Sequence, residues 1–312
     1  MNKRCSIIIR AYNEEKHIGR LLEGITRQTI GGVEIILVDS GSTDATVDIA
    51  RPYGVKVVHI SPTEFTFGRS LNLGLEAASN ESVVIASAHV YPVYPDWLER
   101  LLEPLADSTV ALAYGKQRGP ETANFSERQI YHQWYPERSV LHQDHPFCNN
   151  ANAAVRRSLW KVHPYDETLT GLEDLAWARW TMAEGHALAY VAEAEVIHVH
   201  RETPSGVYNR YRREAMAFKQ IYPEAHFNLW DFVRLTTSNI LSDLRQAARQ
   251  GVLLRNMAGI LWFRFMQFHG TRMGYRQSGP LTSRLRQTFY YPPERVESRD
   301  RGRSVEPIRY DE

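Results

Sequence analysis

Cysteine is scarce in this sequence of 312 residues, which contains only Cys5 and Cys148. The two lie far apart and form no Cys-x-x-Cys pair, so the sequence argues against a disulfide scaffold and against a zinc knuckle. Proteins with few cysteines are typical of reducing compartments. We therefore expect a cytoplasmic protein.

Long apolar runs are missing as well. The first one, Ile7 to Ile9, is too short for the apolar core of a signal peptide. The longest later one, residues 259–268, is interrupted by Arg264, whereas a membrane span needs about 20 apolar residues. We expect a soluble chain that at most rests on a membrane surface.

Neither sign of charge dominates. Lysine and arginine number 37, and aspartate and glutamate number 36. A nearly neutral chain does not attract a polyanion, so we expect no nucleic-acid partner. The length is sufficient for one large domain with a substantial appendage.

Short apolar runs alternate with amphipathic stretches through the first third of the chain. We expect strands at residues 6–10, 33–38, 55–60 and 83–86, with helices between them. This alternation predicts an α/β fold with a doubly wound, mostly parallel sheet. Residues 114–147 have a weaker pattern, which suggests a long functional loop with one helix.

The alternation stops after His200. Helical patterns follow at residues 205–220, 229–250 and 257–275, and a charged, proline-containing stretch ends the chain. We therefore divide the chain into a catalytic domain at 1–204, a helical extension at 205–290 and a loose tail at 291–312.

Polar side chains follow the fourth strand, where Ser87 and His89 come directly after the apolar run. In open α/β sheets the ligand lies beyond the carboxyl ends of the strands, so these two residues mark the centre of a site. The competing interpretation is that His89 only satisfies backbone groups in a turn.

Residues at three other strand and helix ends are candidates for contact with a nucleotide. Asp39 ends the second strand, where it could accept an N–H of a nucleobase or cap the turn at Ser42. Tyr12, after the first strand, could stack on the same base or belong to the core. Arg69 and Asn72 begin a helix and could meet phosphate or sugar oxygens, although Arg69 could also lie on a solvated helix face.

Several of these residues form part of a recognisable series. The segments Ile8 to Glu15, Val38 to Thr46 and Arg69 to Gly74 resemble, in order and interval, the N-terminal half of a family 2 glycosyltransferase of GT-A fold. Together with Pro92 to Trp97, they are most similar to bacterial rhamnosyltransferase-type enzymes of surface-polysaccharide assembly. The resemblance covers about residues 5–200.

The resemblance implies that Ala11, Tyr12, Glu14 and Asp39 hold a nucleotide base and its ribose. It also implies an Asp-x-Asp metal motif after the fourth strand, but this sequence has Ser87-Ala88-His89 there. A neutral imidazole binds Mn²⁺ or another transition ion and is a poor ligand for Mg²⁺. We therefore expect a divalent metal, Mn²⁺ rather than Mg²⁺.

Two adjacent carboxylates, Glu173 and Asp174, stand directly before a predicted helix. They match the catalytic pair of the resembled family, in which the second carboxylate is the general base. Acidic residues at a helix N-terminus are also ordinary caps. We expect the helix dipole to lower the pKa of Asp174 and to keep it ionised.

Histidines follow at the interval where the family has a metal-binding histidine. His198 and His200 lie two apart, so on a strand they point to the same side, and with His89 they could form a three-histidine pocket. The alternative is an exposed strand face. Asn150 and Asn152 fall where the family lines the acceptor and donor-sugar pocket.

Residues 241–288 hold eight arginines and one acidic residue, interleaved with aromatic and aliphatic side chains. This pattern suits contact with an anionic surface such as the inner membrane. It equally suits a helical cap that packs on the core and exposes its arginines.

The first hypothesis is an inverting glycosyltransferase that moves a sugar from a nucleotide-sugar donor to a hydroxyl of a saccharide or lipid-linked acceptor, in cell-surface polysaccharide synthesis. The missing Asp-x-Asp motif supports a second hypothesis, a catalytically inactive sugar-nucleotide-binding subunit. A third is a metallohydrolase that uses the histidines and acts without any nucleotide.

Overall fold

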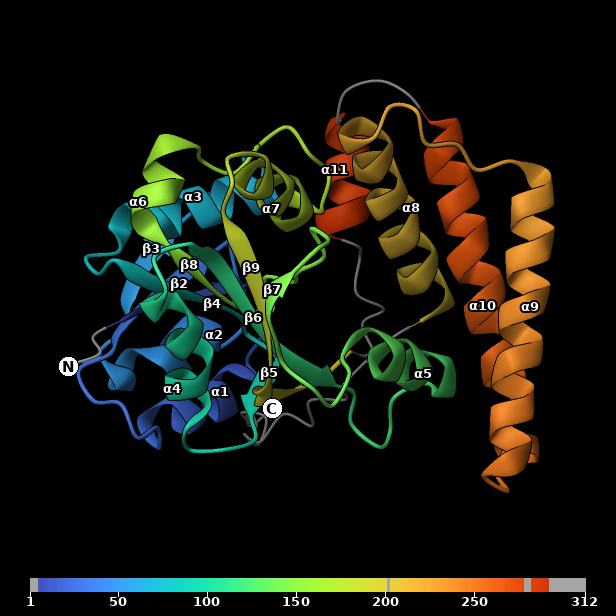
Figure 1. Cartoon of the computed structure of the whole chain (residues 1–312), viewed down its shortest axis with the longest axis horizontal. Helices are drawn as coiled ribbons and strands as arrows, with labels where there is room; N and C mark the ends of the chain where they lie inside the picture. Colours follow the sequence, from blue (N-terminus) through green and yellow to red (C-terminus); the bar gives the residue numbers. More distant parts are fainter. Residues whose placement is uncertain (1–4, 201–202, 278–281, 292–312) are drawn as a thin grey trace, which may run out of the picture.

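The computed structural model describes residues 5–200, 203–277 and 282–291. Most of the predicted tail therefore lies outside the described residues. Figure 1 shows a strand-containing body on one side and three long helices on the other.

The first four strands form the parallel half of the sheet, as predicted. They are β1 (Ser6–Ala11), β2 (Glu34–Asp39), β3 (Lys56–His59) and β4 (Ser82–Ser87), and they pair in parallel in the order β3-β2-β1-β4. The helices between them are α1 (Ile18–Thr26), α2 (Thr46–Ala50) and α3 (Phe67–Ala77). Because the strands run the same way, their carboxyl ends lie together at one edge of the sheet.

The second half of the sheet mixes parallel and antiparallel pairs. Its strands are β5 (Val90–Pro92), β6 (Val110–Arg118), β7 (Val140–Gln143), β8 (Asn152–Arg156) and β9 (Ala187–His198). β8 lies antiparallel between β4 and β6, β9 pairs in parallel with β6, and the short strands β5 and β7 pair with β9 in the antiparallel direction. The predicted α/β class is confirmed.

The expected loop at 114–147 is more ordered than predicted. It contains the end of β6, helix α5 (Phe125–Trp134) and β7. The polar residues of β6 obscure the apolar pattern that would have predicted a strand. One of them, Gln117, is buried and contacts His198. Short helices α4 (Trp97–Leu102) and α6 (Arg157–Val162) were also not predicted, whereas α7 (Glu173–Ala183) was.

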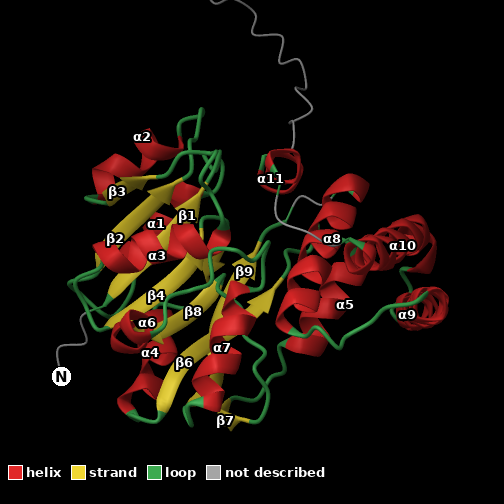
Figure 2. Cartoon of the chain, turned by 90° about the horizontal axis from the view of Figure 1, so that it is seen from above, coloured by secondary structure: helices red, strands yellow, loops and turns green. Residues whose placement is uncertain are grey.

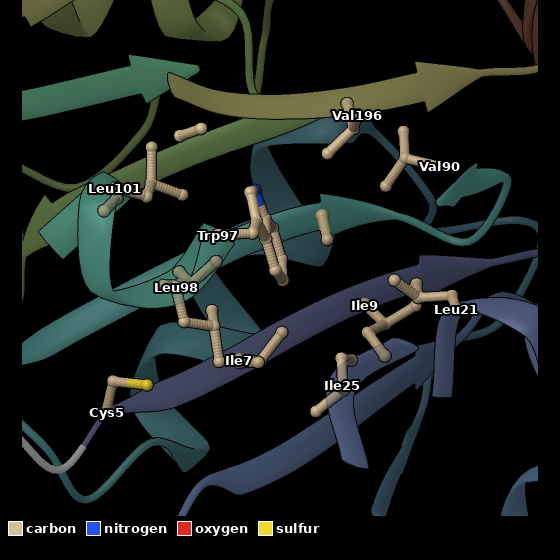
Figure 3. Packing of buried hydrophobic residues seen from close by; sticks show 14 of the residues in the cluster. Cys5, Ile7, Ile9, Leu21, Ile25, Val90, Trp97, Leu98, Leu101 and Val196 are labelled. Atoms are coloured by element: carbon tan, nitrogen blue, oxygen red, sulfur yellow. The ribbon is translucent and has the colours of Figure 1, made fainter. Parts of the chain in front are cut away.

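Both faces of the sheet are packed. Alternate residues of β1 serve opposite faces: Ile7 and Ile9 belong to the cluster with α1 and α4, and Ile8 belongs to the cluster with α3. Figure 3 shows Trp97 in the first of these clusters. Its indole N–H donates to Asn152 Oδ1 at 2.9 Å, which links α4 to β8 inside the core.

The helical part consists of α8 (Pro204–Ile221), α9 (Leu229–Arg249), α10 (Leu253–Arg276) and α11 (Ser283–Tyr290). α10 lies between α8 and α9 (Figure 1). A Cβ at Gly270 or Gly274 would come within 2.4 Å of a backbone oxygen of α8, so only glycine permits this approach. A buried ion pair between Asp243 and Arg264 joins α9 to α10 at 2.7 Å.

Candidate active site

Three histidines meet at the edge where the strands end. His89 follows β4, His198 ends β9 and His200 lies two residues further on. One ligating atom of each lies within 4.8 Å of those of the others, and the ring centroids are 4.1 to 5.5 Å apart. We call these three residues the histidine cluster.

Each ring of the histidine cluster is held through its Nδ1 atom. The acceptors are Glu14 Oε1 for His89 (2.7 Å), Gln117 Oε1 for His198 (2.7 Å) and Glu127 Oε1 for His200 (2.8 Å). An oxygen that fixes one ring nitrogen leaves the other, Nε2, as the lone-pair donor, which is how metal-binding histidines are held in proteins.

Two members of the histidine cluster, His198 and His200, are uncharged near neutral pH. Burial lowers the pKa of His198 and of His200 well below the usual range, and neighbouring positive groups lower both further. Neutral imidazole is the form that binds a metal. Among the described residues, the buried Nε2 atom of His198 also has no hydrogen-bond partner.

These observations fit a divalent transition ion. Three imidazole nitrogen ligands suit Mn²⁺ and its neighbours in the series, whereas Mg²⁺ prefers oxygen. The unpartnered Nε2 atom of His198 would gain a partner from such an ion. The residues present therefore fit a metal site built from histidine in place of Asp-x-Asp.

A cavity of about 370 Å³ lies beside the histidine cluster. Five predicted site residues line it: Ala11, Tyr12, Glu14, Ser87 and His89. The fold thus brings residues from the ends of β1 and β4 together at one cavity. Glu14, for which the resemblance implied a contact with the nucleotide, binds His89 in this structure.

Two arginines that the sequence analysis did not select also line this cavity. The guanidinium groups of Arg10 and Arg213 lie 4.9 Å and 4.7 Å from the ring centroid of Phe67, and Arg10 also pairs with Glu173 at 3.2 Å. They bring positive charge to the cavity from β1 and α8. Arg10 could have been found because it is the last residue of the strand predicted at residues 6–10.

Helix α11 contributes Phe289 and Tyr290 to the same cavity, although the sequence predicted no individual helix beyond residue 275. Tyr291 packs edge-on against Tyr12 with a centroid distance of 4.6 Å and donates to the Ser40 carbonyl at 3.1 Å. Figure 2 shows α11 between the strands and α8. The run of three aromatic residues at 289–291 was the overlooked signal.

Asp39 caps a turn instead of lining the cavity. Its carboxylate accepts from the backbone N–H groups of Gly41 and Ser42 at 3.2 to 3.3 Å and lies 3.4 Å from the His59 ring. This is the turn interpretation that the sequence left open.

The side chains of Arg69, Asn72 and Asn152, which were predicted to contact a ligand, bond to other parts of the chain. The amide of Asn72 bonds Tyr165 and Glu167, and Arg69 pairs with Glu167 at 3.3 Å, so both fasten α3 to the loop before α7. Asn152 is fully buried and uses its amide to bond Trp97 and two backbone carbonyls. These partners come from distant segments, so the sequence pattern does not reveal them.

The carboxylate pair begins α7, and Leu172 before it has a left-handed backbone with φ of 56°. Such strain in a non-glycine residue is found where a site requires it. Asp174 accepts from the backbone N–H groups of Asn150 (3.0 Å) and Leu175 (2.8 Å). Asn150 therefore positions Asp174 through its backbone, and its side chain is buried.

The expected pKa of Asp174 was wrong. Burial, followed by the nearby Glu173 carboxylate, raises the pKa of Asp174 from its usual 3.8 to about 7. The loss of hydration outweighs the helix dipole and the two N–H donors, because Asp174 is only 9% exposed. A pKa near neutrality suits a general base, which must be ionised and still bind a proton strongly.

Solved structures of similar shape establish the fold. The mannosyltransferase PcManGT from Pyrobaculum calidifontis, in complex with GDP-Man and Mn²⁺, has a TM-score of 0.58 at 20% identity, covering 85% of this chain and 84% of its own. TarS of S. aureus (residues 1–349), in complex with UDP-GlcNAc, has a TM-score of 0.54 at 16% identity, covering 85% and 90%. The chain thus has the GT-A fold of glycosyltransferases.

The model of "Glycosyl transferase family 2" matches residues 6–163, and the chain belongs to that family. Two relatives are O-antigen chain rhamnosyltransferases of Salmonella. WbaN of Salmonella anatum is 30% identical over 59% of this chain and 62% of its own length. RfbN of Salmonella typhimurium is 27% identical over 67% and 70%. The chain thus spans somewhat under two thirds of the first relative.

Proposed function

We propose that this chain is an inverting glycosyltransferase that moves a hexose or deoxyhexose from a nucleotide-sugar donor to a hydroxyl of a saccharide or lipid-linked acceptor, in cell-surface polysaccharide synthesis. The observation that carries the proposal is the position of Arg10. It lines the cavity beside the histidine cluster and pairs with Glu173, the neighbour of Asp174. This contact connects the donor cavity to the candidate base.

In the proposed reaction, Asp174 takes the proton of the acceptor hydroxyl while its oxygen attacks the anomeric carbon. The bond from that carbon to the diphosphate oxygen breaks, and its electron pair leaves with the nucleoside diphosphate. Because attack and departure occur on opposite sides, the configuration inverts. Arg10 and Arg213 balance the negative charge that develops on the leaving group.

The histidine cluster would hold the divalent metal, Mn²⁺ in preference to Mg²⁺. When bound, the metal supplies positive charge to the leaving diphosphate. The task of Glu14, Gln117 and Glu127 is to hold the three rings in one orientation. The nucleotide part of the donor would enter the cavity lined by Ala11, Tyr12 and Ser87. PcManGT and TarS, which bind GDP-Man and UDP-GlcNAc, support a nucleotide-sugar donor.

We further propose that the outer helices rest on the cytoplasmic face of an anionic membrane. In the described part of the chain, no helix is both long and apolar enough to span a bilayer. Several large apolar side chains of α9 and α10 are nevertheless exposed, with Trp230 at 70% and Leu254 at 88%. The exposed arginines beside them are Arg234, Arg245, Arg249 and Arg255. A lipid-linked acceptor would make such contact useful.

The second candidate remains an inactive sugar-nucleotide-binding subunit, which the replacement of Asp-x-Asp by Ser87-Ala88-His89 favours. Release of nucleoside diphosphate separates the two candidates. Purified protein is incubated with UDP-, dTDP- and GDP-sugars, with and without Mn²⁺. An active transferase slowly hydrolyses its nucleotide-sugar donor in the presence of Mn²⁺ and so releases the nucleoside diphosphate. An inactive binder is stabilised by a donor in a thermal melt and releases nothing.

A further inference from the structure

Helix α11 and the residue after it, Tyr291, cover one side of the donor cavity, the cavity beside the histidine cluster. Phe289 and Tyr290 line this cavity, and the three consecutive aromatic side chains are buried, each being 6 to 8% exposed. They come from the far end of the described chain, outside the segment 6–163 that the family model matches. We call residues 282–291 the aromatic strap.

Tyr291 makes contacts that would suit a nucleobase. Its ring packs edge-on against Tyr12 at a centroid distance of 4.6 Å, and its phenolic O–H donates to the Ser40 carbonyl at 3.1 Å. Tyr12 and Ser40 both line the donor cavity. A nucleobase likewise offers a flat ring and N–H donors. Tyr291 therefore uses the groups that a base entering beside Tyr12 would use.

A second contact of the aromatic strap uses a group that the proposed reaction assigns to the leaving diphosphate. The Nη1 atom of Arg213 donates to the backbone carbonyl of Phe289 at 3.4 Å, and Arg213 also lines the donor cavity. Its buried Nε atom has no hydrogen-bond partner in the part of the chain that the structure describes. Guanidinium groups bind phosphate oxygens through several N–H donors at once. Release of Phe289 would therefore free Arg213 for a diphosphate.

The space that the aromatic strap leaves is small for a complete donor. The donor cavity has a volume of about 370 Å³, near the lower end of the range of about 300–1,000 Å³ that small-molecule sites occupy. A nucleotide sugar contains a base, a ribose, two phosphates and a hexose, and it needs more space than this. Removal of α11 from the wall would enlarge the cavity beside Tyr12 and Ser40.

We propose that the aromatic strap is autoinhibitory: Tyr291 occupies the position of the nucleobase, and the donor binds after the strap has withdrawn. Burial of the three aromatic rings favours the docked strap in the absence of a nucleotide. The apparent affinity for a nucleotide is then the intrinsic affinity reduced by the fraction of molecules whose strap is open. This inference rests on the proposed transferase function and specifies how its donor cavity is regulated.

Hydrogen exchange of the full chain, followed by mass spectrometry with and without UDP, dTDP or GDP and Mn²⁺, tests the proposal. A nucleotide that binds should slow exchange in residues 11–15 and speed exchange in residues 285–291, because it protects the first segment and displaces the second. Slower or unchanged exchange in residues 285–291 would mean that the aromatic strap is a fixed wall, and it overturns this inference alone. If no nucleotide slows exchange in residues 11–15, the transferase proposal fails together with this one.

Calorimetric titration of the full-length variant Tyr291→Ala with the same nucleotide gives a second test. The variant lacks the competing ring and phenol, so its affinity should rise about fivefold or more. Tyr291→Phe keeps the ring and should gain less. The matched control Tyr94→Ala removes an exposed tyrosine outside the donor cavity and should leave the affinity unchanged. Weaker binding by Tyr291→Ala, or an equal gain in the control, contradicts the proposal. Thermal melts show whether each variant is folded, and the exchange experiment decides if one is not.

Discussion

Replacement of Asp174 by asparagine changes the charge at the candidate base and little of its shape. We expect Asp174→Asn to lower the rate of transfer by about 10² to 10⁴-fold, the usual contribution of a general base. The binding of nucleoside diphosphate should be nearly unchanged. In the wild type, kcat/KM for the acceptor should rise with pH through about 7, because only the ionised carboxylate accepts a proton.

The same substitution has a stability signature. The pKa of Asp174 is about 7 in the folded protein, and its usual value is 3.8. Between pH 4 and pH 7, Asp174 is therefore protonated in the folded protein and ionised in the unfolded chain. By linkage the wild type then loses stability as pH rises from about 4 to about 7. Between pH 5 and pH 8 the loss is about 3 kcal/mol at most, or roughly 5 °C in Tm.

The asparagine variant lacks this titration. The Tm of the variant minus the Tm of the wild type should therefore increase from pH 5 to pH 8. The asparagine side chain accepts poorly from the two N–H donors, but this lowers the Tm of the variant by the same amount at every pH. Differential scanning calorimetry at four pH values gives the trend in Tm, and a sugar-transfer assay over the same pH range gives the rate profile. A Tm difference that stays flat with pH, or a rate that is indifferent to pH near 7, would show that Asp174 does not titrate as the base.

Three further changes test other parts of the structure. Gln117→Leu removes the acceptor that orients one ring of the histidine cluster and should weaken Mn²⁺ binding about 10- to 100-fold by isothermal titration calorimetry. Trp230→Ser combined with Leu254→Ser removes two exposed apolar side chains and should reduce sedimentation with vesicles that contain anionic lipid. Asp243→Ala leaves the buried Arg264 guanidinium without its carboxylate and should cost about 3–5 kcal/mol in urea unfolding.

Matched controls accompany these changes. Gln117→Glu keeps an accepting oxygen and should retain more Mn²⁺ affinity than Gln117→Leu. Val162→Ser removes an exposed apolar side chain of α6 and should leave vesicle binding as it was. Asp48→Ala breaks an exposed ion pair with Arg51 and should cost less than about 1 kcal/mol. If a control matches its test variant, the corresponding assignment is wrong.

The sequence predicted the parts of the site that depend on local periodicity. Because β1 and β4 are short apolar runs in a parallel sheet, the residues just after them had to share an edge, and Tyr12 and His89 do line one cavity. The two-residue spacing of His198 and His200 likewise placed both rings on one side.

The sequence did not reveal contacts between distant segments. Asn72 and Asn152 were assigned to ligands, but their amides bond backbone and side chains more than 35 positions away. No local pattern encodes such partners. The pKa of Asp174 was misjudged for the same reason, since its burial results from the packing of other elements around α7. Arg213 reaches the donor cavity from the helical extension, beyond the resembled region.

We propose that the histidine cluster holds a divalent transition ion beside the diphosphate of the donor. Electron paramagnetic resonance of Mn²⁺, titrated with protein in the presence of GDP, UDP or dTDP, measures this directly. The signal of free Mn²⁺ should fall with the wild type to a one-to-one end point for at least one nucleotide, and should persist with His198→Ala. A signal that persists with the wild type for every nucleotide, or that falls equally with the variant, would contradict the claim.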